Sequence, residues 1–219
     1  GIGRDHQNFM FVKVGTGIGC GIVINGEIYR GTNGYPGHIA HVSIDPNGPV
    51  CHCGNAGCLE RFASGPAIAE QAMRAAQNGH SPILLELMNE RGGRLLPEDV
   101  GAAVVRGDKV ANNIIIEAGH TIGKMLAALV SFMNPSLVVI GGGVSRIGPQ
   151  FLISIHRTIL EYCLPLSTKD LLVYKSEIEH RAGMEGAVAL AIDIIFTSPQ
   201  KDLHHEPALA ALSQAQQPG

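Results

Sequence analysis

The sequence predicts an α/β fold, and two observations carry this prediction. Short apolar runs rich in β-branched residues alternate with longer segments of helical periodicity, which is typical of strands that alternate with helices. The chain has 219 residues, of which 45% are hydrophobic. One large domain, or one lobe of a bigger protein, can therefore bury a full core. We find no internal repeat.

The first strands are predicted close to the N-terminus. The segment FMFVKV (9–14) alternates like a half-buried strand. The glycine-rich segment 15–26 follows as a turn, a second strand and a hairpin signal at Asn25-Gly26. Residues 27–31 would form the return strand, and a loop rich in His, Cys, Asn and Gly is expected over about 32–58.

Helical periodicity begins after this loop. Ser64-Gly65-Pro66 is a start signal for a helix over 67–76. Further helices are predicted over 82–89 and after Pro97. The longest is predicted over 108–133, where apolar residues step by three and four positions. They predict one buried stripe: Ile115, Ala118, Ile122, Met125, Leu129 and Phe132.

The C-terminal part predicts two more strands and two more helices. SLVVIGGGVS (136–145) is typical of a buried strand that ends in a glycine turn. A helix over 150–163 and a strand over 171–175 are expected next. The apolar segment 182–196 predicts a buried helix, whereas 198–219 has weak patterning and is expected to be a mobile tail. The folded part would then be residues 1–197.

Charge and composition exclude several classes of partner. The formal net charge is -3 with no run of Lys or Arg, so the chain has no electrostatic footprint for DNA or anionic lipid. No apolar stretch reaches the roughly 18 residues of a membrane span, and the N-terminus does not look like a signal peptide. Three of the five cysteines share one loop, which suits metal binding in a reducing compartment. We therefore expect a cytoplasmic protein with no membrane partner.

The cysteine-rich loop (38–60) predicts a structural zinc site. Four potential ligands fall within 18 positions: His41, Cys51, Cys53 and Cys58. Zinc prefers tetrahedral sites of thiolate and imidazole ligands, and this set leaves no position for a substrate water. The alternatives are a loop with unliganded cysteines, or His38 or His52 as the fourth ligand.

Two glycine turns are candidates for binding a nucleotide. GTGIG (15–19) offers backbone amides and the Thr16 hydroxyl to a phosphate. GGGVS (141–145) lies between a buried strand and a helix, where a nucleotide can meet the helix N-terminus. Either turn could instead serve packing alone. The presence of two such turns in one chain favours phosphate binding.

A sugar-binding wall is predicted beside the zinc loop. Glu60 follows the last cysteine of the loop by two residues, and His38 precedes His41 by three. A carboxylate and an imidazole fixed by a rigid metal loop could bind sugar hydroxyls. The alternative is a solvated glutamate and a surface histidine.

Four segments together resemble the hallmark motifs of the ROK family (repressors, open reading frames and kinases): VGTGIGCGIV, GHIAH, CHCGNAGCLE and IGGGVS. The resemblance covers most of residues 9–196. It implies an actin-like, ribonuclease-H-like ATPase fold in two lobes, with sugar and ATP in the cleft. It also implies roles for individual residues: zinc ligation by His41, Cys51, Cys53 and Cys58, sugar contacts by His41 and Glu60, phosphate contacts by Thr16 and Gly17, and adenosine contacts by Gly141, Gly142 and Gly143.

Two departures from the family pattern bear on function. The D-x-G-G-T loop and the Asn-Asp pair of the family's first lobe do not occur at the start of this chain. We therefore expect a C-terminal portion of a longer protein, inactive as an enzyme by itself. His38 also stands where the family has a glutamate, and Ala40 where it has a glycine. A neutral imidazole offers one acceptor where a carboxylate accepts from two hydroxyls, so sugar recognition should be weaker or altered.

Three functions are compatible with these residues. The first is the sugar-binding effector portion of a ROK transcriptional regulator whose DNA-binding domain lies outside this chain; VKVGTGIG and LPLSTKDLLV also look more like the family's regulators. The second is the C-terminal lobe of a sugar kinase that uses ATP and Mg. The third is a non-catalytic, zinc-stabilised dimerisation module. The apolar helices after residue 108 favour a homodimer or higher homo-oligomer in all three.

Overall fold

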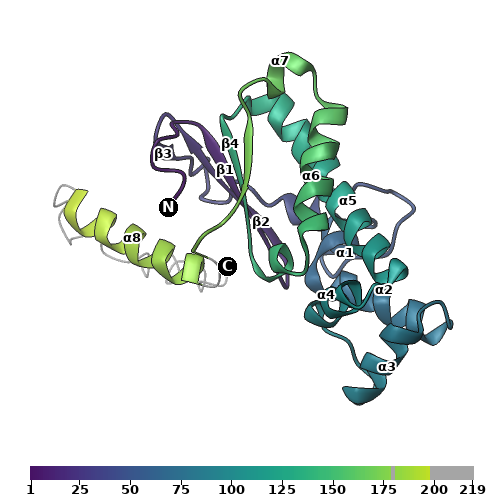
Figure 1. Ribbon diagram of the computed structural model, residues 1–219. Coiled ribbons are helices and arrows are strands. Elements are labelled where there is room, and N and C mark those ends of the chain that lie inside the picture. Colours follow the sequence, from purple (N-terminus) through teal and green to yellow (C-terminus); the bar gives the residue numbers. More distant parts are fainter. Residues whose placement is uncertain (179–180, 198–219) are drawn as a thin grey trace, which may run out of the picture. The chain divides into compact units, whose positions relative to one another are not determined.

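The computed structural model describes residues 1–178 and 181–197. The chain divides into two compact units, one ending at His180 and one beginning at Arg181. The first unit contains a five-stranded sheet in the order β3-β2-β1-β4-β5 (Figure 1). The tail predicted over 198–219 lies outside the described residues.

The sheet is mixed, and its pairing follows from the order of its strands along the chain. Strand β1 (Phe9–Val14) pairs antiparallel with β2 (Ile18–Ile24), which pairs antiparallel with β3 (Glu27–Ile28). Strand β4 (Leu137–Gly141) is parallel to β1, and β5 (Leu172–Lys175) is parallel to β4. The predicted mixture of strands and helices is confirmed.

The β2–β3 hairpin is shorter than predicted. Asn25 and Gly26 form the turn with φ of 54° and 80°, as a two-residue hairpin requires. The return strand ends at Ile28 instead of residue 31, because the chain turns at Gly31 with φ of 60° and leaves the sheet.

Most helices lie where their start signals predict them. They are α1 (Glu60–Ala63), α2 (Gly65–Gln77), α3 (Pro82–Glu90), α4 (Pro97–Val105), α5 (Lys109–Met133), α6 (Pro149–Tyr162) and α7 (Pro165–Thr168). The side chains of Ser64, Ser81 and Asp108 accept backbone N–H bonds at the starts of α2, α3 and α5, which satisfies donors that a helix leaves unpaired. Helices α1 and α7 were not predicted, because four residues carry no periodic signal.

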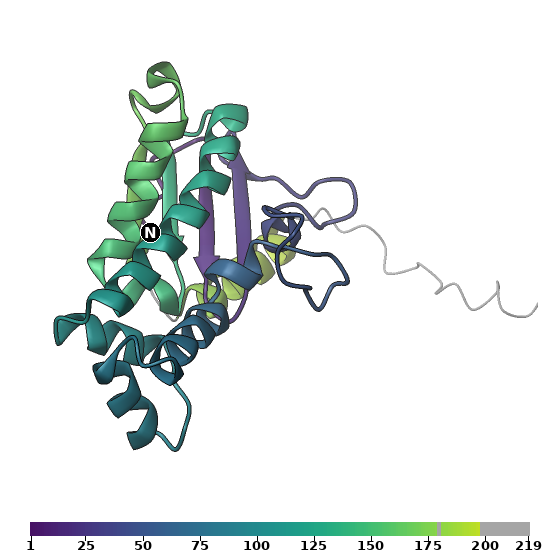
Figure 2. The same cartoon turned by 90° about the vertical axis from the view of Figure 1, so that its right-hand side faces the viewer.

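Helices α5 and α6 run side by side across one face of the sheet (Figure 2). The inner face of β1 and the stripe of α5 belong to one core. The predicted stripe is wrong at its C-terminal end, because Phe132 is 88% exposed. At about 100° per residue, Phe132 lies about 100° around the helix from Ile115. Leu126 and Val130 take the buried positions instead.

Helix α5 also corrects the expectation that no stretch could span a membrane. Its 25 residues are long and apolar enough to cross a membrane, and the mean hydropathy over an 18-residue stretch of it is 1.3. However, 44% of this stretch is buried inside the structure. Such burial is typical of the core helix of a folded domain.

Helix α8 (Ala182–Thr197) belongs to the second unit. The segment is helical as predicted, but the predicted burial is not observed. The exposed apolar side chains are Met184, Val188, Ile192, Ile195 and Phe196. The described part of this unit contains no second element that could cover them.

Candidate functional site

Both glycine turns lie at the same edge of the sheet. The GTGIG turn follows β1, and Gly141 to Gly143 follow β4. Because β1 and β4 are parallel, with Lys13 opposite Gly141, both strands end there. The carboxyl ends of parallel strands are where open α/β sheets bind ligands.

The second glycine turn packs against the end of β1, where the GTGIG turn begins. Gly142 has φ of 89°, and a Cβ at this position would lie 2.2 Å from the carbonyl oxygen of Val14. Only glycine fits so close to the chain that enters the GTGIG turn. No atom lies within 4 Å of a Cβ built on Gly143, and Thr16 is exposed. The structure thus brings the predicted nucleotide-binding residues together; their role stays a prediction.

Short antiparallel pairings fold the cysteine-rich loop. Ser43 pairs with Cys58, and Val50 with Ala56. The Cys51 amide donates to the Asn55 carbonyl at 2.7 Å. The loop is thus held by its own backbone, and the fully buried Leu59 joins its end to the core.

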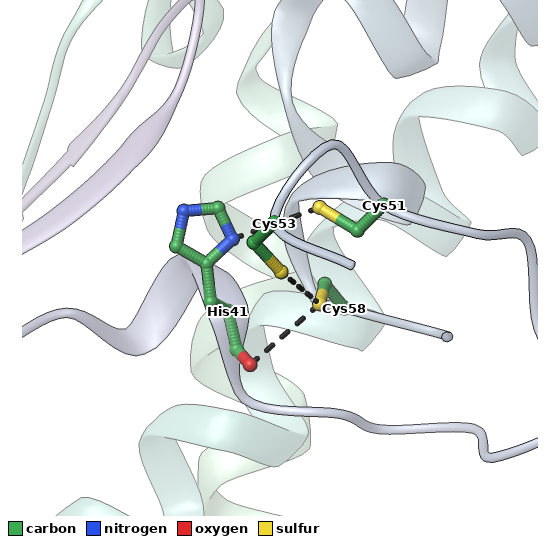
Figure 3. Close-up of side chains that lie close together, drawn as sticks. All are labelled: His41, Cys51, Cys53 and Cys58. Carbon is green, nitrogen blue, oxygen red and sulfur yellow. Dashed lines mark hydrogen bonds between the residues drawn. The ribbon is translucent and has the colours of Figure 1, made fainter. Parts of the chain in front are cut away.

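The four predicted metal ligands meet in this loop (Figure 3). One ligand atom from each of His41, Cys51, Cys53 and Cys58 lies within 4.8 Å of all the others. His41 Nδ1 is 3.6 Å from Cys51 Sγ, and Cys53 Sγ is 3.6 Å from Cys58 Sγ. A tetrahedral zinc would require about 3.6 Å between nitrogen and sulfur and about 3.8 Å between two sulfurs. The donor set therefore fits a structural zinc.

The pKa values of two thiols in the cluster are shifted in opposite directions. Burial raises the pKa of the Cys58 thiol to about 12, and this thiol donates to the His41 carbonyl at 3.6 Å. The pKa of Cys53 is lowered, mainly by a backbone hydrogen bond with Asn55. Cys53 therefore ionises before Cys58, and a bound metal would supply the charge that holds Cys58 as a thiolate.

Glu60 connects the cysteine-rich loop with the GTGIG turn. Its Oε2 lies 2.7 Å from the position of a Cβ built on Gly17. Its Oε1 lies 3.6 Å from Nδ1 of His52. The Gly65 amide, at the start of α2, donates to the Gly15 carbonyl at 2.7 Å. Two backbone segments distant in sequence are thus joined beside the carboxylate.

His38 lies outside this cluster. Its side chain is exposed, and its ring centroid is 5.8 Å from that of Tyr35. Among the described residues no hydrogen bond or ion pair joins it to His41 or Glu60, and it belongs to neither possible metal-ligand set. The Gly37 carbonyl accepts from the Cys20 amide at 3.0 Å, so the segment is held against β2 before it turns to His41. Of the two histidines expected as alternative metal ligands, only His52 lies close enough to the cluster. It forms a second possible ligand set with His41, Cys51 and Glu60.

A cavity of about 570 Å³ lies elsewhere in the first unit. It is lined by residues from 1–11, by Val23, Gly26, Ile28 and Val139, and by 176–178. None of the predicted metal-, sugar- or nucleotide-binding residues lines it. The chemistry-bearing residues gather at the open edge of the sheet instead.

Comparison with known proteins identifies the family of the chain. The ROK family model matches residues 1–194. The chain belongs to the ROK family. A putative xylose repressor from Caldicellulosiruptor sp. (strain Rt8B.4) is 34% identical over 200 residues, which are 89% of this chain and 48% of the repressor.

Solved ROK structures include both regulators and kinases. A ROK family transcriptional regulator, homologous to the E. coli MLC protein, shares 35% identity with a TM-score of 0.74, over 83% of this chain and 44% of that one. A glucokinase from Streptomyces griseus, in complex with glucose and AMPPNP, shares 30% identity with a TM-score of 0.78, over 86% of this chain and 61% of that one. The mixed α/β sheet is thus that of ROK sugar kinases and regulators. The chain spans about half the length of the relatives it matches.

Proposed function

We propose that this chain is the sugar-binding effector portion of a cytoplasmic ROK transcriptional regulator, whose DNA-binding domain lies outside residues 1–219. The observation that carries the proposal is the position of Glu60, between the cysteine-rich loop and the GTGIG turn. A carboxylate accepts hydrogen bonds from sugar hydroxyls. Its burial to 17% exposure in this place leaves it little freedom to lose on binding.

Under the same proposal, the cysteine cluster has a structural role. Zinc bound by His41, Cys51, Cys53 and Cys58 would be fully coordinated and would hold the loop that leads into Glu60. It would keep no open position for a reacting water. The metal would then serve ligand recognition by fixing the protein around it.

His38 supports a sensor over a kinase. The resemblance to the family implies a glutamate at this position, and a histidine removes one acceptor from the sugar-binding segment. A regulator needs only a difference in binding between two states, whereas a kinase must hold the reacting hydroxyl in line with a phosphate. Weaker or altered sugar recognition is therefore easier to reconcile with sensing.

A sugar kinase is the second candidate, because both glycine turns lie at the same edge of the sheet. Thr16, Gly17 and the segment 141–143 could then border ATP with its Mg. The Streptomyces griseus glucokinase was solved in complex with glucose and AMPPNP. A zinc-stabilised dimerisation module is a third candidate. It is supported by exposed apolar side chains on α6 and after it: Leu160, Tyr162, Leu164 and Leu166. A homodimer is compatible with each of the three.

The reading frame upstream of Gly1 separates the first two candidates. A helix-turn-helix segment there supports the regulator. A D-x-G-G-T loop and an Asn-Asp pair, without a helix-turn-helix, would overturn it in favour of the kinase. Sugar binding itself is tested by calorimetric titration of the full-length gene product against hexoses, xylose and N-acetyl sugars. Glu60→Gln should weaken the binding about tenfold, as expected for a charged hydrogen-bond acceptor.

A further inference from the structure

We propose that His52 is a positioning residue, which holds the Glu60 carboxylate in place for ligand binding and so couples the metal loop to recognition. This inference rests on the proposed function, in which Glu60 contacts the sugar. His52 stands between two predicted metal ligands, Cys51 and Cys53. Its backbone is therefore fixed by the same loop that would carry the zinc.

The His52 ring is directed by its neighbours toward Glu60. It meets the His41 ring edge to face, with centroids 5.1 Å apart and planes at 82°. Its Nδ1 is 3.6 Å from Oε1 of Glu60. A movement of roughly half an ångström brings this pair to hydrogen-bond distance. His41 thus supports the ring that supports the carboxylate.

Glu60 is confined from the opposite side as well. Its Oε2 faces Gly17, in the space that a Cβ there would occupy. With His52 at one oxygen and the GTGIG turn at the other, the flexible glutamate side chain has few alternative positions. Fixing an acceptor before the ligand arrives lowers the entropic cost of binding.

His52 could instead be a metal ligand, since His41, Cys51, His52 and Glu60 also place their ligand atoms within 4.8 Å of one another. His41 and the three cysteines already supply the four ligands of a tetrahedral zinc without His52. The side chain of His52 is 72% exposed, whereas Cys51 and Cys58 are buried. A structural site is better served by three thiols, two of which are buried. Nδ1 of His52 also lies 3.7 Å from Sγ of Cys51, and once that sulfur binds the metal the imidazole is left for Glu60.

The experiment is a double-mutant cycle on the full-length gene product, with calorimetric titration of the sugar that the wild type binds. His52→Ala should lower the affinity about fivefold and retain one zinc per chain by elemental analysis. His52→Asn, which places an N–H donor near the position of Nδ1, should restore most of the affinity. In a Glu60→Gln background, His52→Ala should change the affinity less than twofold. His80→Ala, an exposed histidine at the end of α2, is the matched control and should bind like the wild type.

Each other outcome overturns the inference. Loss of zinc in His52→Ala would make His52 a ligand. An equal loss of affinity with and without Glu60 would mean that His52 does not act through this carboxylate. Unchanged affinity in His52→Ala would remove the positioning role while sugar binding by the wild type still stood. A wild type that binds no sugar would overturn the proposed function, and this inference with it.

Discussion

The carboxylate of Glu60 occupies the space that a side chain at Gly17 would need, with Oε2 2.7 Å from the ideal Cβ position. One residue starts the helix that follows the cysteine-rich loop, and the other lies in the turn between β1 and β2. The predicted sugar-binding carboxylate and the predicted phosphate-binding turn therefore share one contact. A substitution at Gly17 should move the Glu60 carboxylate, and a substitution at Glu60 should change the surroundings of the turn.

Gly17→Ala should displace the Glu60 carboxylate and lower sugar affinity by about five- to tenfold in the absence of nucleotide. Stability should change little, because the group that must move is the end of a flexible side chain. Gly19→Ala is the matched control, since no atom lies within 4 Å of a Cβ built there. Calorimetric titration and thermal unfolding of both variants check this. Equal sugar affinities for the two variants would show that the Glu60–Gly17 contact does not matter for binding.

Cys53→Ser should abolish binding of one zinc per chain, as measured by elemental analysis or native mass spectrometry. Loss of a structural metal costs roughly 3 kcal/mol or more, which lowers Tm by roughly 6–12 °C for a chain of this size. Cys20→Ser is the control, because Cys20 belongs to neither possible metal-ligand set and burial raises the pKa of its thiol to about 11, which keeps it protonated. A wild type without metal, with freely reactive thiols, would contradict the metal site.

Zinc affinity should fall as the pH is lowered from 8 to 6. The pKa of Cys58 is raised to about 12 by burial, so its thiol is protonated throughout this range and must lose its proton to bind zinc. One displaced proton makes the affinity fall by about tenfold per pH unit, and further protons add to this. Competition with a chromophoric chelator at pH 6, 7 and 8 measures the slope. An affinity independent of pH would exclude Cys58 as a thiolate ligand.

His38→Glu should change sugar affinity by about fivefold or more, in the direction of tighter binding, because it restores a two-oxygen acceptor. The structure places His38 on the surface beside Tyr35, so the variant should fold like the wild type. His80→Glu controls for the added negative charge at another exposed histidine. If His38→Glu and the wild type bind every sugar alike, position 38 does not contact the ligand, and the preference for a regulator loses its main support from the sequence.

Local signals made much of the fold predictable. The start signal at Ser64-Gly65-Pro66 and the helix predicted from Pro82 are confirmed by the structure. The apolar run at 137–141 is a fully buried strand. The cysteine cluster was predictable for the same reason, because its ligands are close in sequence and short backbone pairings close the loop.

Tertiary contacts account for what the sequence did not predict. The surface position of His38 depends on a hydrogen bond between Gly37 and Cys20 of β2. The Glu60–Gly17 contact joins two elements that only the folded sheet brings together. The sequence contains one indication about His52, its position between two predicted ligand cysteines. This position indicated a possible metal ligand and did not indicate a contact with Glu60. Phe132 shows the limit of periodicity, because the predicted spacing drifts around the helix until it leaves the buried face, and Phe132 is exposed while Val130 is buried.

The most direct test is one calorimetric experiment, in which sugar is titrated into the full-length gene product in the presence of Mg-ATP. A sensor gives a saturable heat of binding that ends with each injection, whereas a kinase gives a sustained heat as sugar is turned over. The account predicts saturable binding of at least one sugar, without sustained heat and without ADP above a no-protein control. Sustained heat with ADP production would show a kinase and contradict the account. The absence of any binding heat across the sugar panel would contradict sugar sensing altogether.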